Sequence, residues 1–382
     1  MKILHIVAYF NEIWKYQENY LAEIQSSNGH DVLVVTSNLN FPYPNYQTTA
    51  LNIIGPRKKA LKSFTINGFR VQYLKAKFEF SGRVWLNGLT ETIKSFKPDL
   101  IVCHGVTQPA TIKICRLKWL NCPIIADEHM LFSDIENSRI KQIILSLFGK
   151  LVRKLLSQRV TKFVAIANGT QRVLEKVLHL PTEKIQMIPL GTDTSLFKPD
   201  FDQGLKFRIA QHIDVNSILI GYTGKIEPRK QLEVLINVLA NFEHEHLHLL
   251  IVGNMEGVYG NVLKNELKKL KIPFTLLPSQ PQSILPAIYN ACNFMVWPAH
   301  QTISMMDAAA CGKAFICANY LQERLQQNQG IGIVPGNANE LSNALRTLID
   351  SPELCLEMGQ NALNWAIQTL SWEAVNKRFI NT

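Results

Sequence analysis

The sequence of 382 residues lacks several features that define large classes of protein. It has no run of 18 consecutive apolar residues, so no segment is expected to cross a membrane as a helix. No two cysteines have CxxC spacing, and the stretch 253–260 does not fit GxGxxG, which argues against a redox dithiol and against nicotinamide or flavin binding. Charged residues make up only 18% of the chain and hydrophobic residues 47%, which excludes a disordered chain or a coiled coil and predicts a large core.

Seven cysteines are present, an odd number, and most lie within apolar stretches. This pattern is typical of reduced thiols in a cytosolic protein and not of a disulfide framework. The first ten residues contain a short apolar run without a small-residue cleavage site, so they predict a first strand and not a signal peptide. We therefore expect a cytoplasmic protein, either free or attached to the cytosolic face of a membrane.

Short apolar runs alternate with helical patterns along the whole chain, which is typical of βα units around parallel sheets. The length favours two domains, and the Asp-, Gly- and Pro-rich stretch 191–207 predicts a boundary near Pro199. We expect an α/β protein with two doubly wound domains, residues 1–199 and 200–365, that face each other across a cleft. The expected strands are 2–10, 31–37, 69–76, 99–105, 123–129, 162–167 and 184–190 in the first domain, and 217–224, 247–253, 274–278, 293–298, 314–318 and 330–335 in the second.

Acidic residues are scarce in the first half of the chain relative to basic ones. Residues 1–200 contain 26 basic and 15 acidic side chains, a balance of +11, whereas residues 201–382 contain 14 and 15, a balance of −1. This asymmetry predicts an anionic partner for the first half only. Nucleic acid is not favoured, because neither a known nucleic-acid motif nor a basic strand interleaved with aromatics is present.

Two segments of the second half predict a site for a phosphorylated ligand. In GYTGKIEPRKQLEVLI (221–236), a strand ends at Gly224 and a loop carrying Lys225, Arg229 and Lys230 opens a helix. Cations beside the free N–H groups of a helix N-terminus suit a diphosphate, although a solvated basic turn has the same pattern.

The second segment, residues 293–316, predicts a buried strand, a polar loop and a short helix that begins at residues 302–304 and ends near Gly312. Asp307 lies one turn into this apolar helix. A carboxylate there suits a bidentate hydrogen bond to a ribose diol, and the alternative is an Asp that favours the first turn through the helix dipole.

A third group of polar residues ends two strands of the first half. Asp127, Glu128 and His129 follow the strand 123–129, and His104 ends the preceding strand. The carboxyl ends of parallel strands meet at a cleft, where His129 could bind a sugar or phosphate oxygen or act as acid or base. A satisfied structural histidine is the alternative, more so for His104 than for His129.

Taken in order, these segments resemble the family 4 glycosyltransferases, which are retaining group 1 enzymes of the GT-B architecture. That architecture comprises two facing Rossmann-like domains and the cleft between them. The resemblance implies that the final segment, residues 366–382, is a helix that crosses back to the first domain. Five segments carry the resemblance: NGHDVLVVTS (28–37), IQMIPLGTDTSLFKP (185–199), GKIEPRK (224–230), DAAACGKAFI (307–316) and SWEAVNKRF (371–379).

The resemblance implies a metal-independent hexosyltransferase that needs no cofactor besides its nucleoside-diphosphate sugar donor. It implies that Lys225 and Lys230 neutralise the diphosphate and that Asp307 holds the ribose. His129 takes the place of the cleft histidine that contacts the transferred sugar, so His129 and Asp307 are the expected catalytic residues. The expected donor-binding residues are Gly224, Lys225, Lys230, Ile303, Ser304 and Asp307.

The sequence departs from the family pattern at the sugar end of the donor site and at the acceptor loop. Ala299 replaces the first acid of an acidic pair, so Gln301, Thr302 or Ser304 are expected to supply neutral contacts there. Gln231 replaces the glycine that follows the second lysine. The segment 11–20 replaces a glycine-rich loop, so that residues 16–18 are expected to shape acceptor recognition.

Two basic stretches account for much of the charge of the first half. Residues 138–162 contain seven basic side chains and no acid, with aliphatic residues at helical spacing. Such a helix can lie on an anionic membrane surface, but the favoured interpretation is an ordinary helix with its apolar face in the core. The stretch 55–70 is expected to be an exposed loop. The aliphatic residues at helical spacing in the stretch 138–162 are Ile140, Ile143, Ile144, Leu147, Leu151 and Leu155.

These observations predict a retaining transferase that moves a hexose-type sugar to a hydroxyl of a glycan or lipid-linked acceptor in cell-envelope or exported polysaccharide biosynthesis. A nucleotide-sugar 2-epimerase is the alternative enzyme, and a non-catalytic sugar-nucleotide-binding scaffold is the alternative from another class. No metal site is expected, because His246 and His248 have no third ligand at a fixed spacing.

Overall fold

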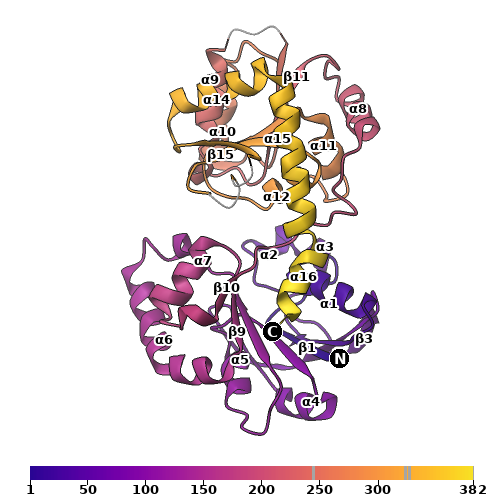
Figure 1. Cartoon of the computed structure of the whole chain (residues 1–382), viewed down its shortest axis with the longest axis vertical. Helices are drawn as coiled ribbons and strands as arrows, with labels where there is room; N and C mark the ends of the chain where they lie inside the picture. Colours follow the sequence, from indigo (N-terminus) through magenta and orange to yellow (C-terminus); the bar gives the residue numbers. More distant parts are fainter. Residues whose placement is uncertain (243–245, 322–324, 326–327, 382) are drawn as a thin grey trace. The chain divides into compact units, whose positions relative to one another are not determined.

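The computed structural model describes residues 1–242, 246–321, 325 and 328–381, and the chain divides into two compact units (Figure 1). Unit 1 comprises Met1–Leu190 and Val375–Thr382, and unit 2 comprises Gly191–Ala374. The expected boundary at Pro199 thus differs from the division that the structure gives. The residues just before Pro199 group with unit 2 because Thr192 forms a β-bridge with Ser371 and its hydroxyl donates to Asp307.

Unit 1 is built on an eight-stranded sheet in which every strand pair is parallel except β3 with β4. The strand order is β10-β9-β8-β7-β1-β2-β4-β3, so the direction of winding reverses between β1 and β7. A separate antiparallel ribbon contains β5 (Ala76–Phe80) and β6 (Arg83–Leu86). The strands of the sheet are β1 (Lys2–Val7), β2 (Asp31–Ser37), β3 (Ser63–Ile66), β4 (Phe69–Leu74), β7 (Leu100–His104), β8 (Ile124–Glu128), β9 (Lys162–Ala165) and β10 (Ile185–Met187).

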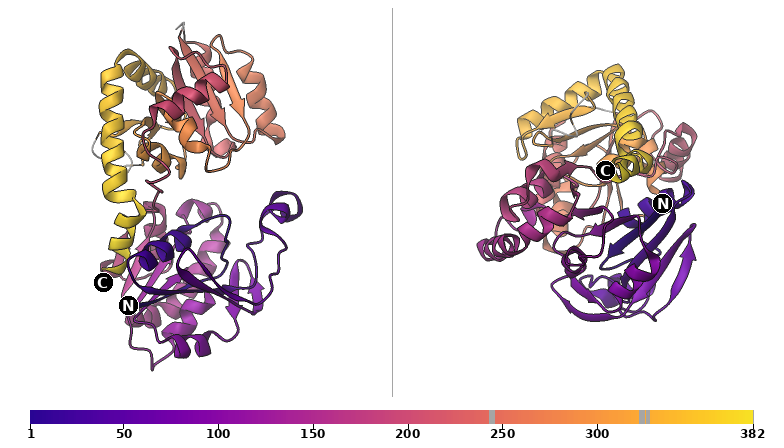
Figure 2. Two further views of the ribbon diagram at one scale, coloured as in Figure 1. Left: turned by 90° about the vertical axis from the view of Figure 1, so that its right-hand side faces the viewer. Right: turned by 60° about the horizontal axis from the view of Figure 1, so that its bottom comes forward.

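Helices flank both faces of this sheet (Figure 2). Its central strands are buried along their whole length, as expected for a parallel sheet covered on both sides. Helix α16 (Trp372–Ile380) begins in unit 2 and ends in unit 1. The other helical segments of unit 1 are α1 (Gln17–Ser27), α2 (Tyr46–Thr49), α3 (Leu51–Ile54), α4 (Leu89–Phe96), α5 (Pro109–Cys115), α6 (Arg139–Arg159), α7 (Asn168–Arg172), the 3-10 turns Phe132–Asp134 and Thr182–Lys184, and the π turn Val173–Val177.

Unit 2 is built on a six-stranded sheet in which all strand pairs are parallel. Its order, β13-β12-β11-β14-β15-β16, is that of a dinucleotide-binding Rossmann domain, in which ligands bind where the winding reverses, here between β11 and β14. The strands are β11 (Ile218–Thr223), β12 (Leu247–Val252), β13 (Phe274–Leu277), β14 (Phe294–Trp297), β15 (Ala314–Ala318) and β16 (Gly330–Ile333). The helical segments are α8 (Phe201–Ala210), the 3-10 turn Pro228–Lys230, α9 (Leu232–Ala240), α10 (Gly257–Leu267), α11 (Leu285–Ala291), α12 (Ser304–Ala310), α14 (Ala338–Asp350), α15 (Pro352–Trp365) and the π turn Ala366–Leu370.

The expected exposed loop at residues 55–70 is wrong for its second half. Strand β3 lies there and pairs with β4 across the turn Asn67-Gly68, whose φ angles are 47° and 86°. Two successive positive φ angles are what a tight type I′ hairpin turn requires, and Asn-Gly is its preferred pair. The Asn-Gly turn therefore favours a β-hairpin here, although the segment is basic and polar.

Candidate functional site

The loops that follow β11 and β14 lie against each other at the reversal point of unit 2. Gly224 directly follows β11 and has a φ of 135°. A Cβ atom added to Gly253, which follows β12, would lie 2.3 Å from the Gly224 carbonyl oxygen, so the two backbones approach too closely for any side chain at that position. A Cβ at Gly224 would itself lie 3.5 Å from Oγ1 of Thr302. Indole Nε1 of Trp297 donates to the Thr223 carbonyl oxygen at 2.8 Å and fixes the two strand ends to each other.

Lys230 is buried in this loop pair without an acidic partner among the described residues. Only 8% of the residue is exposed, and its Nζ donates to the carbonyl oxygens of Gln301 at 2.7 Å and His300 at 3.4 Å. Burial lowers the pKa of Lys230 to about 8. Buried cations are normally paired with anions, whereas the hydrogen-bond acceptors of the Lys230 ammonium in the described chain are carbonyl oxygens.

The other cations of the segment are arranged differently. Lys225 is exposed, and its backbone carbonyl accepts a hydrogen bond from the Tyr222 hydroxyl at 2.9 Å. Arg229 is half exposed and pairs with Glu227 at 2.7 Å, so its charge is already compensated. Gly224, Lys225 and Lys230 thus lie on one loop, and among the three cations of this segment it is Lys230 that is buried.

Asp307 lies on the first turn of α12, as the sequence indicated. It is 8% exposed, and its Oδ1 accepts a hydrogen bond from the Thr192 hydroxyl at 2.7 Å. Burial raises the pKa of Asp307 to about 7. The helix begins at Ser304, directly after Ile303, so both predicted phosphate-contact residues lie at its N-terminus.

One residue of this neighbourhood was not identified from the sequence. Tyr289 of α11 is fully buried, its hydroxyl lies 3.4 Å from Oγ1 of Thr223, and it interacts electrostatically with Asp307. Burial raises the pKa of this hydroxyl above its ordinary range. A tyrosine within a helical apolar pattern carries no signal that would separate it from a core aromatic residue.

Gln231, which stands where the family has glycine, adopts a left-handed backbone with φ 53° and ψ 41°. Its Oε1 is buried without a partner among the described residues. Gln231→Gly is therefore expected to stabilise the protein by about 0.5–1 kcal/mol, because glycine adopts this conformation without strain. Chemical denaturation should show this gain, and Gln231→Ala, which also removes Oε1 but keeps the strain, should not show it.

In unit 1, the expected histidines and carboxylate meet at the carboxyl ends of β7 and β8. Asp127 is completely buried, and its Oδ2 lies 2.7 Å from Nδ1 of His104 and 3.7 Å from Nε2 of His129. The His129 side chain is 44% exposed, so it alone of the three offers an accessible edge. Glu128 fixes the same turn, because its Oε1 accepts the backbone N–H groups of His129 and Met130 at 3.1 and 3.2 Å.

Two residues that were expected to shape acceptor recognition are buried against this group. Gln17 donates its amide to Oδ2 of Asp127 at 2.9 Å, and Glu18 interacts electrostatically with His104 and His129. Burial raises the pKa of Glu18. Gln17 is thus occupied by the protein itself, whereas Tyr16 remains 44% exposed.

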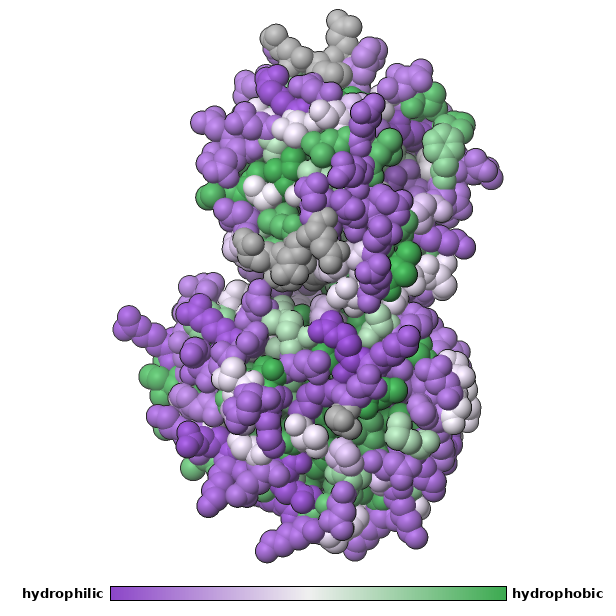
Figure 3. Space-filling view, in the orientation of Figure 1, coloured by the Kyte–Doolittle hydropathy of each residue, from purple (hydrophilic) through white to green (hydrophobic). Residues whose placement is uncertain are grey.

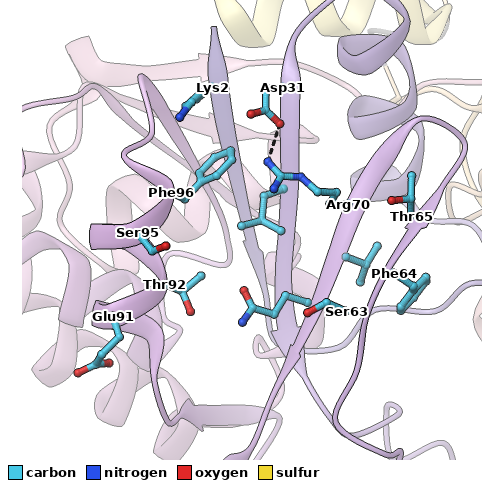
Figure 4. Close-up of a pocket in the computed structure, with 13 residues that line it drawn as sticks. Lys2, Asp31, Ser63, Phe64, Thr65, Arg70, Glu91, Thr92, Ser95 and Phe96 are labelled. Atoms are coloured by element: carbon cyan, nitrogen blue, oxygen red, sulfur yellow. Dashed lines mark hydrogen bonds and ion pairs between the residues drawn. The ribbon is translucent and has the colours of Figure 1, made fainter.

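A hollow of about 730 Å³ in unit 1 lies away from these residues (Figure 4). Lys2 and Asp31, at the amino ends of β1 and β2, line it together with Phe96 of α4, and Arg70 pairs with Asp31 at 2.7 Å. Since His104 and Asp127 lie at the opposite ends of the strands, this hollow is not part of the candidate site.

Part of the run that was considered for metal binding, residues 243–245, lies outside the described residues. His248 is on β12, and its Nε2 lies 2.9 Å from the Thr275 hydroxyl. In the parts of the chain that the structure describes, no three His, Cys, Asp or Glu side chains are grouped as a metal site would require.

The fold and these groups define a class: a two-domain protein with two Rossmann-like sheets and a buried lysine and an aspartate at the reversal point of the second. Comparison with protein families identifies the particular family. Residues 19–196 match the model described as Glycosyltransferase Family 4, and residues 205–365 match the model described as Glycosyl transferases group 1. The chain therefore belongs to the family 4, group 1 glycosyltransferases.

Individual relatives are distant. The chain is 26% identical over 229 residues to the D-inositol 3-phosphate glycosyltransferase of Corynebacterium glutamicum, a match that covers 55% of this chain and about half, 54%, of that protein. Among solved structures, the glycosyltransferase of Rickettsia africae has a TM-score of 0.73 at 16% identity and covers 99% of this chain and 96% of its own. Alr3699/HepE of Anabaena, in complex with UDP and glucose, has a TM-score of 0.66 at 19% identity and covers 99% and 98%. These likenesses support the GT-B fold.

Proposed function

We propose that this protein is a retaining glycosyltransferase that moves a hexose-type sugar from a nucleoside-diphosphate sugar to a hydroxyl of a glycan or lipid-linked acceptor. The observation that carries the proposal is Lys230, a buried cation held only by carbonyl oxygens beside the N-terminus of α12. A diphosphate supplies the negative charge that this arrangement lacks. Cell-envelope or exported polysaccharide assembly is the proposed setting.

The proposed reaction needs stabilisation of its leaving group more than it needs a strong base. The bond from the acceptor oxygen to the anomeric carbon forms as the bond from that carbon to the diphosphate breaks, and the acceptor proton passes to a phosphate oxygen. Lys225, Lys230 and the backbone N–H groups of Ile303 and Ser304 stabilise the charge that develops on the diphosphate, so no metal ion or other cofactor is required. Asp307 holds the ribose, and His129 contacts the transferred sugar.

The relatives suggest which ligands to test first. The Anabaena protein was crystallised with UDP and glucose, so a uridine nucleotide is the first donor to try. Several relatives are named for D-inositol 3-phosphate, an anionic compound, which agrees with the basic balance of the first half of this chain.

A panel of nucleotide sugars, incubated with candidate acceptors with and without EDTA, tests the proposal through release of nucleoside diphosphate. Turnover of one donor that is unaffected by EDTA is the expected result. Binding of a donor without any diphosphate release would favour a scaffold, and conversion of the donor to its 2-epimer would favour the epimerase.

We further propose that helix α6 attaches the protein to an anionic membrane surface. Its buried side is formed by Leu145, Gly149 and Leu156, and a Cβ at Gly149 would lie 2.7 Å from the backbone of Leu178. The expectation that the aliphatic stripe faces the core is wrong, because five of its members are 56–83% exposed: Ile140, Ile143, Ile144, Leu147 and Leu151.

The position of these five residues supports a membrane role. They follow one another at helical spacing on the side opposite Gly149, and the exposed basic residues Lys141, Lys150 and Lys154 flank them. Most of the face drawn in Figure 3 is hydrophilic, with hydrophobic patches on both units. An apolar stripe flanked by lysines suits insertion among anionic headgroups. The described helices include none that could cross a bilayer.

The double variant Ile144→Asp/Leu151→Asp is expected to lower the fraction of protein that floats with anionic liposomes about tenfold, because two exposed aliphatic side chains proposed to insert into the membrane are replaced by carboxylates that anionic headgroups repel. Leu356→Asp, at a 75% exposed leucine of α15, is the matched control and should float like the unmodified protein. Salt should weaken flotation. Equal flotation with uncharged vesicles would contradict the proposal.

A further inference from the structure

Buried polar residues of unit 1 form one continuous chain of hydrogen bonds that ends at Asp127, whose Oδ2 lies 3.7 Å from Nε2 of His129. At its far end, Nε2 of Gln25 donates to Oδ1 of Asn376 in α16 at 3.0 Å. Oε1 of Gln25 lies 2.7 Å from Nε2 of His5, and Nδ1 of His5 lies 3.0 Å from Nε2 of His104. All of these residues are nine-tenths or more buried.

The Gln25 side-chain amide determines which atom donates and which accepts in each hydrogen bond of this chain. Since Oε1 of Gln25 can only accept a hydrogen bond, His5 must donate through Nε2. Burial lowers the pKa of His5 to about 3, so this histidine is neutral. Nδ1 of His5 is then an acceptor, so His104 donates to it through Nε2 and donates to Asp127 through Nδ1. His104 therefore carries both protons and forms a buried ion pair with Asp127.

The Asp127 carboxylate accepts two further hydrogen bonds. Its Oδ1 accepts the backbone N–H of Gly105 at 3.1 Å, and its Oδ2 accepts the Gln17 amide at 2.9 Å. Burial alone would raise the pKa of Asp127, but the paired His104 holds it below its ordinary value. Three hydrogen bonds, one of them from the His104 cation, hold the carboxylate and keep it ionised.

We propose that Asp127 is the positioning residue for His129: it keeps a proton on Nε2 of that ring and leaves Nδ1 to meet the substrate. Nε2 faces Oδ2 of Asp127 at 3.7 Å, while Glu128 fixes the backbone of the same residue. Only the statement that Nδ1 of His129 meets a substrate rests on the proposed function. The ring orientation is a property of the free protein.

The groups that face His129 come from several elements. Asp127 and Glu128 belong to β8, Glu18 to α1 and His104 to β7. Partial desolvation of this ring lowers the pKa of His129, but the nearby Asp127 carboxylate raises it above the ordinary value. Since His104 already compensates much of the Asp127 charge, loss of that carboxylate should lower the pKa of His129 by about one unit and not by several.

Long-range ¹H–¹⁵N spectra of protein labelled at its ten histidines test the proposal, with His129→Gln to assign the signal. In the unmodified protein the neutral His129 ring is expected to carry its proton on Nε2. In Asp127→Asn the excess of this tautomer over that of a free histidine side chain should be lost, and the pKa of His129 should fall by about one unit. Glu18→Gln, which removes a facing carboxylate not bonded to the ring, should leave the tautomer unchanged.

A proton on Nδ1 of His129 in the unmodified protein would overturn the proposal, and this result does not depend on whether any variant folds. An unchanged tautomer and pKa in folded Asp127→Asn would also overturn it. If the tautomer is as expected but no donor is ever turned over, the proposed function fails and the positioning role of Asp127 stands.

Discussion

Replacement of Lys230 by methionine is expected to weaken binding of a nucleoside diphosphate about 100-fold, because one charge-assisted contact is lost from an enclosed site. Methionine keeps the apolar stem of the lysine and removes only the charge and its donors. Isothermal titration calorimetry with UDP or GDP measures the effect directly. An unchanged dissociation constant would contradict the placement of the diphosphate beside Lys230.

Arg229→Met provides the matched control for Lys230. It removes the same charge one residue away, but Arg229 is half exposed and paired with Glu227, so a change of less than about threefold in the dissociation constant is expected.

The pH dependence of diphosphate binding gives a second test of the role of Lys230. Burial lowers the pKa of Lys230 to about 8, so this residue loses its charge as the pH rises through that value. Affinity for the diphosphate should therefore fall above pH 8 in the unmodified protein and not in Lys230→Met.

Most of the fold could be predicted from the sequence, because parallel strands covered on both faces are short, continuous apolar runs. Each expected strand corresponds to an observed one, with ends that differ by a few residues; the segment 123–129, for example, is Ile124–Glu128 in the structure. The strands that were missed are partly exposed. Ala76–Phe80 and Ser63–Ile66 have exposed or half-buried residues at every position, so they lack the apolar run on which prediction depends.

The positions of the main residues of the candidate site could be predicted from the sequence, but the hydrogen bonds that hold them could not. The positions of Lys230 and Asp307 followed from motifs, but the carbonyl cradle of Lys230 depends on the path of the loop around Gln301, which no local pattern encodes. The buried chain through His5 and Gln25 joins residues 20 and 99 positions apart, so only the tertiary fold reveals it. The exposed stripe of α6 was likewise ambiguous, because an amphipathic pattern does not say which face is buried.

Asp307 is buried, although its proposed role of holding the ribose requires the charged form of its side chain. Its Thr192 hydrogen bond stabilises the carboxylate, but burial dominates and raises the pKa to about 7, above the unfolded value of 3.8. A carboxylate with a raised pKa is costly to ionise in the folded state, so it lowers the stability of the ligand-free protein as the pH rises from 3.8 to 7. A ribose diol that donates two hydrogen bonds to this carboxylate would offset that cost when the nucleotide binds.

Asp307→Asn is therefore expected to change stability and binding in opposite directions. At pH 8 the variant should be more stable than the unmodified protein by about 2–4 kcal/mol, because the buried charge is gone, and this difference should narrow as the pH falls to 5. Its affinity for the nucleotide at pH 8 should be about 10- to 100-fold weaker, because one carboxylate acceptor becomes an amide donor. Calorimetry at pH 6 in buffers of different ionisation enthalpy should show that nucleotide binding releases close to one more proton from the unmodified protein than from the variant. Equal proton release by the two proteins would mean that Asp307 stays protonated in the complex and does not hold the ribose as an anion.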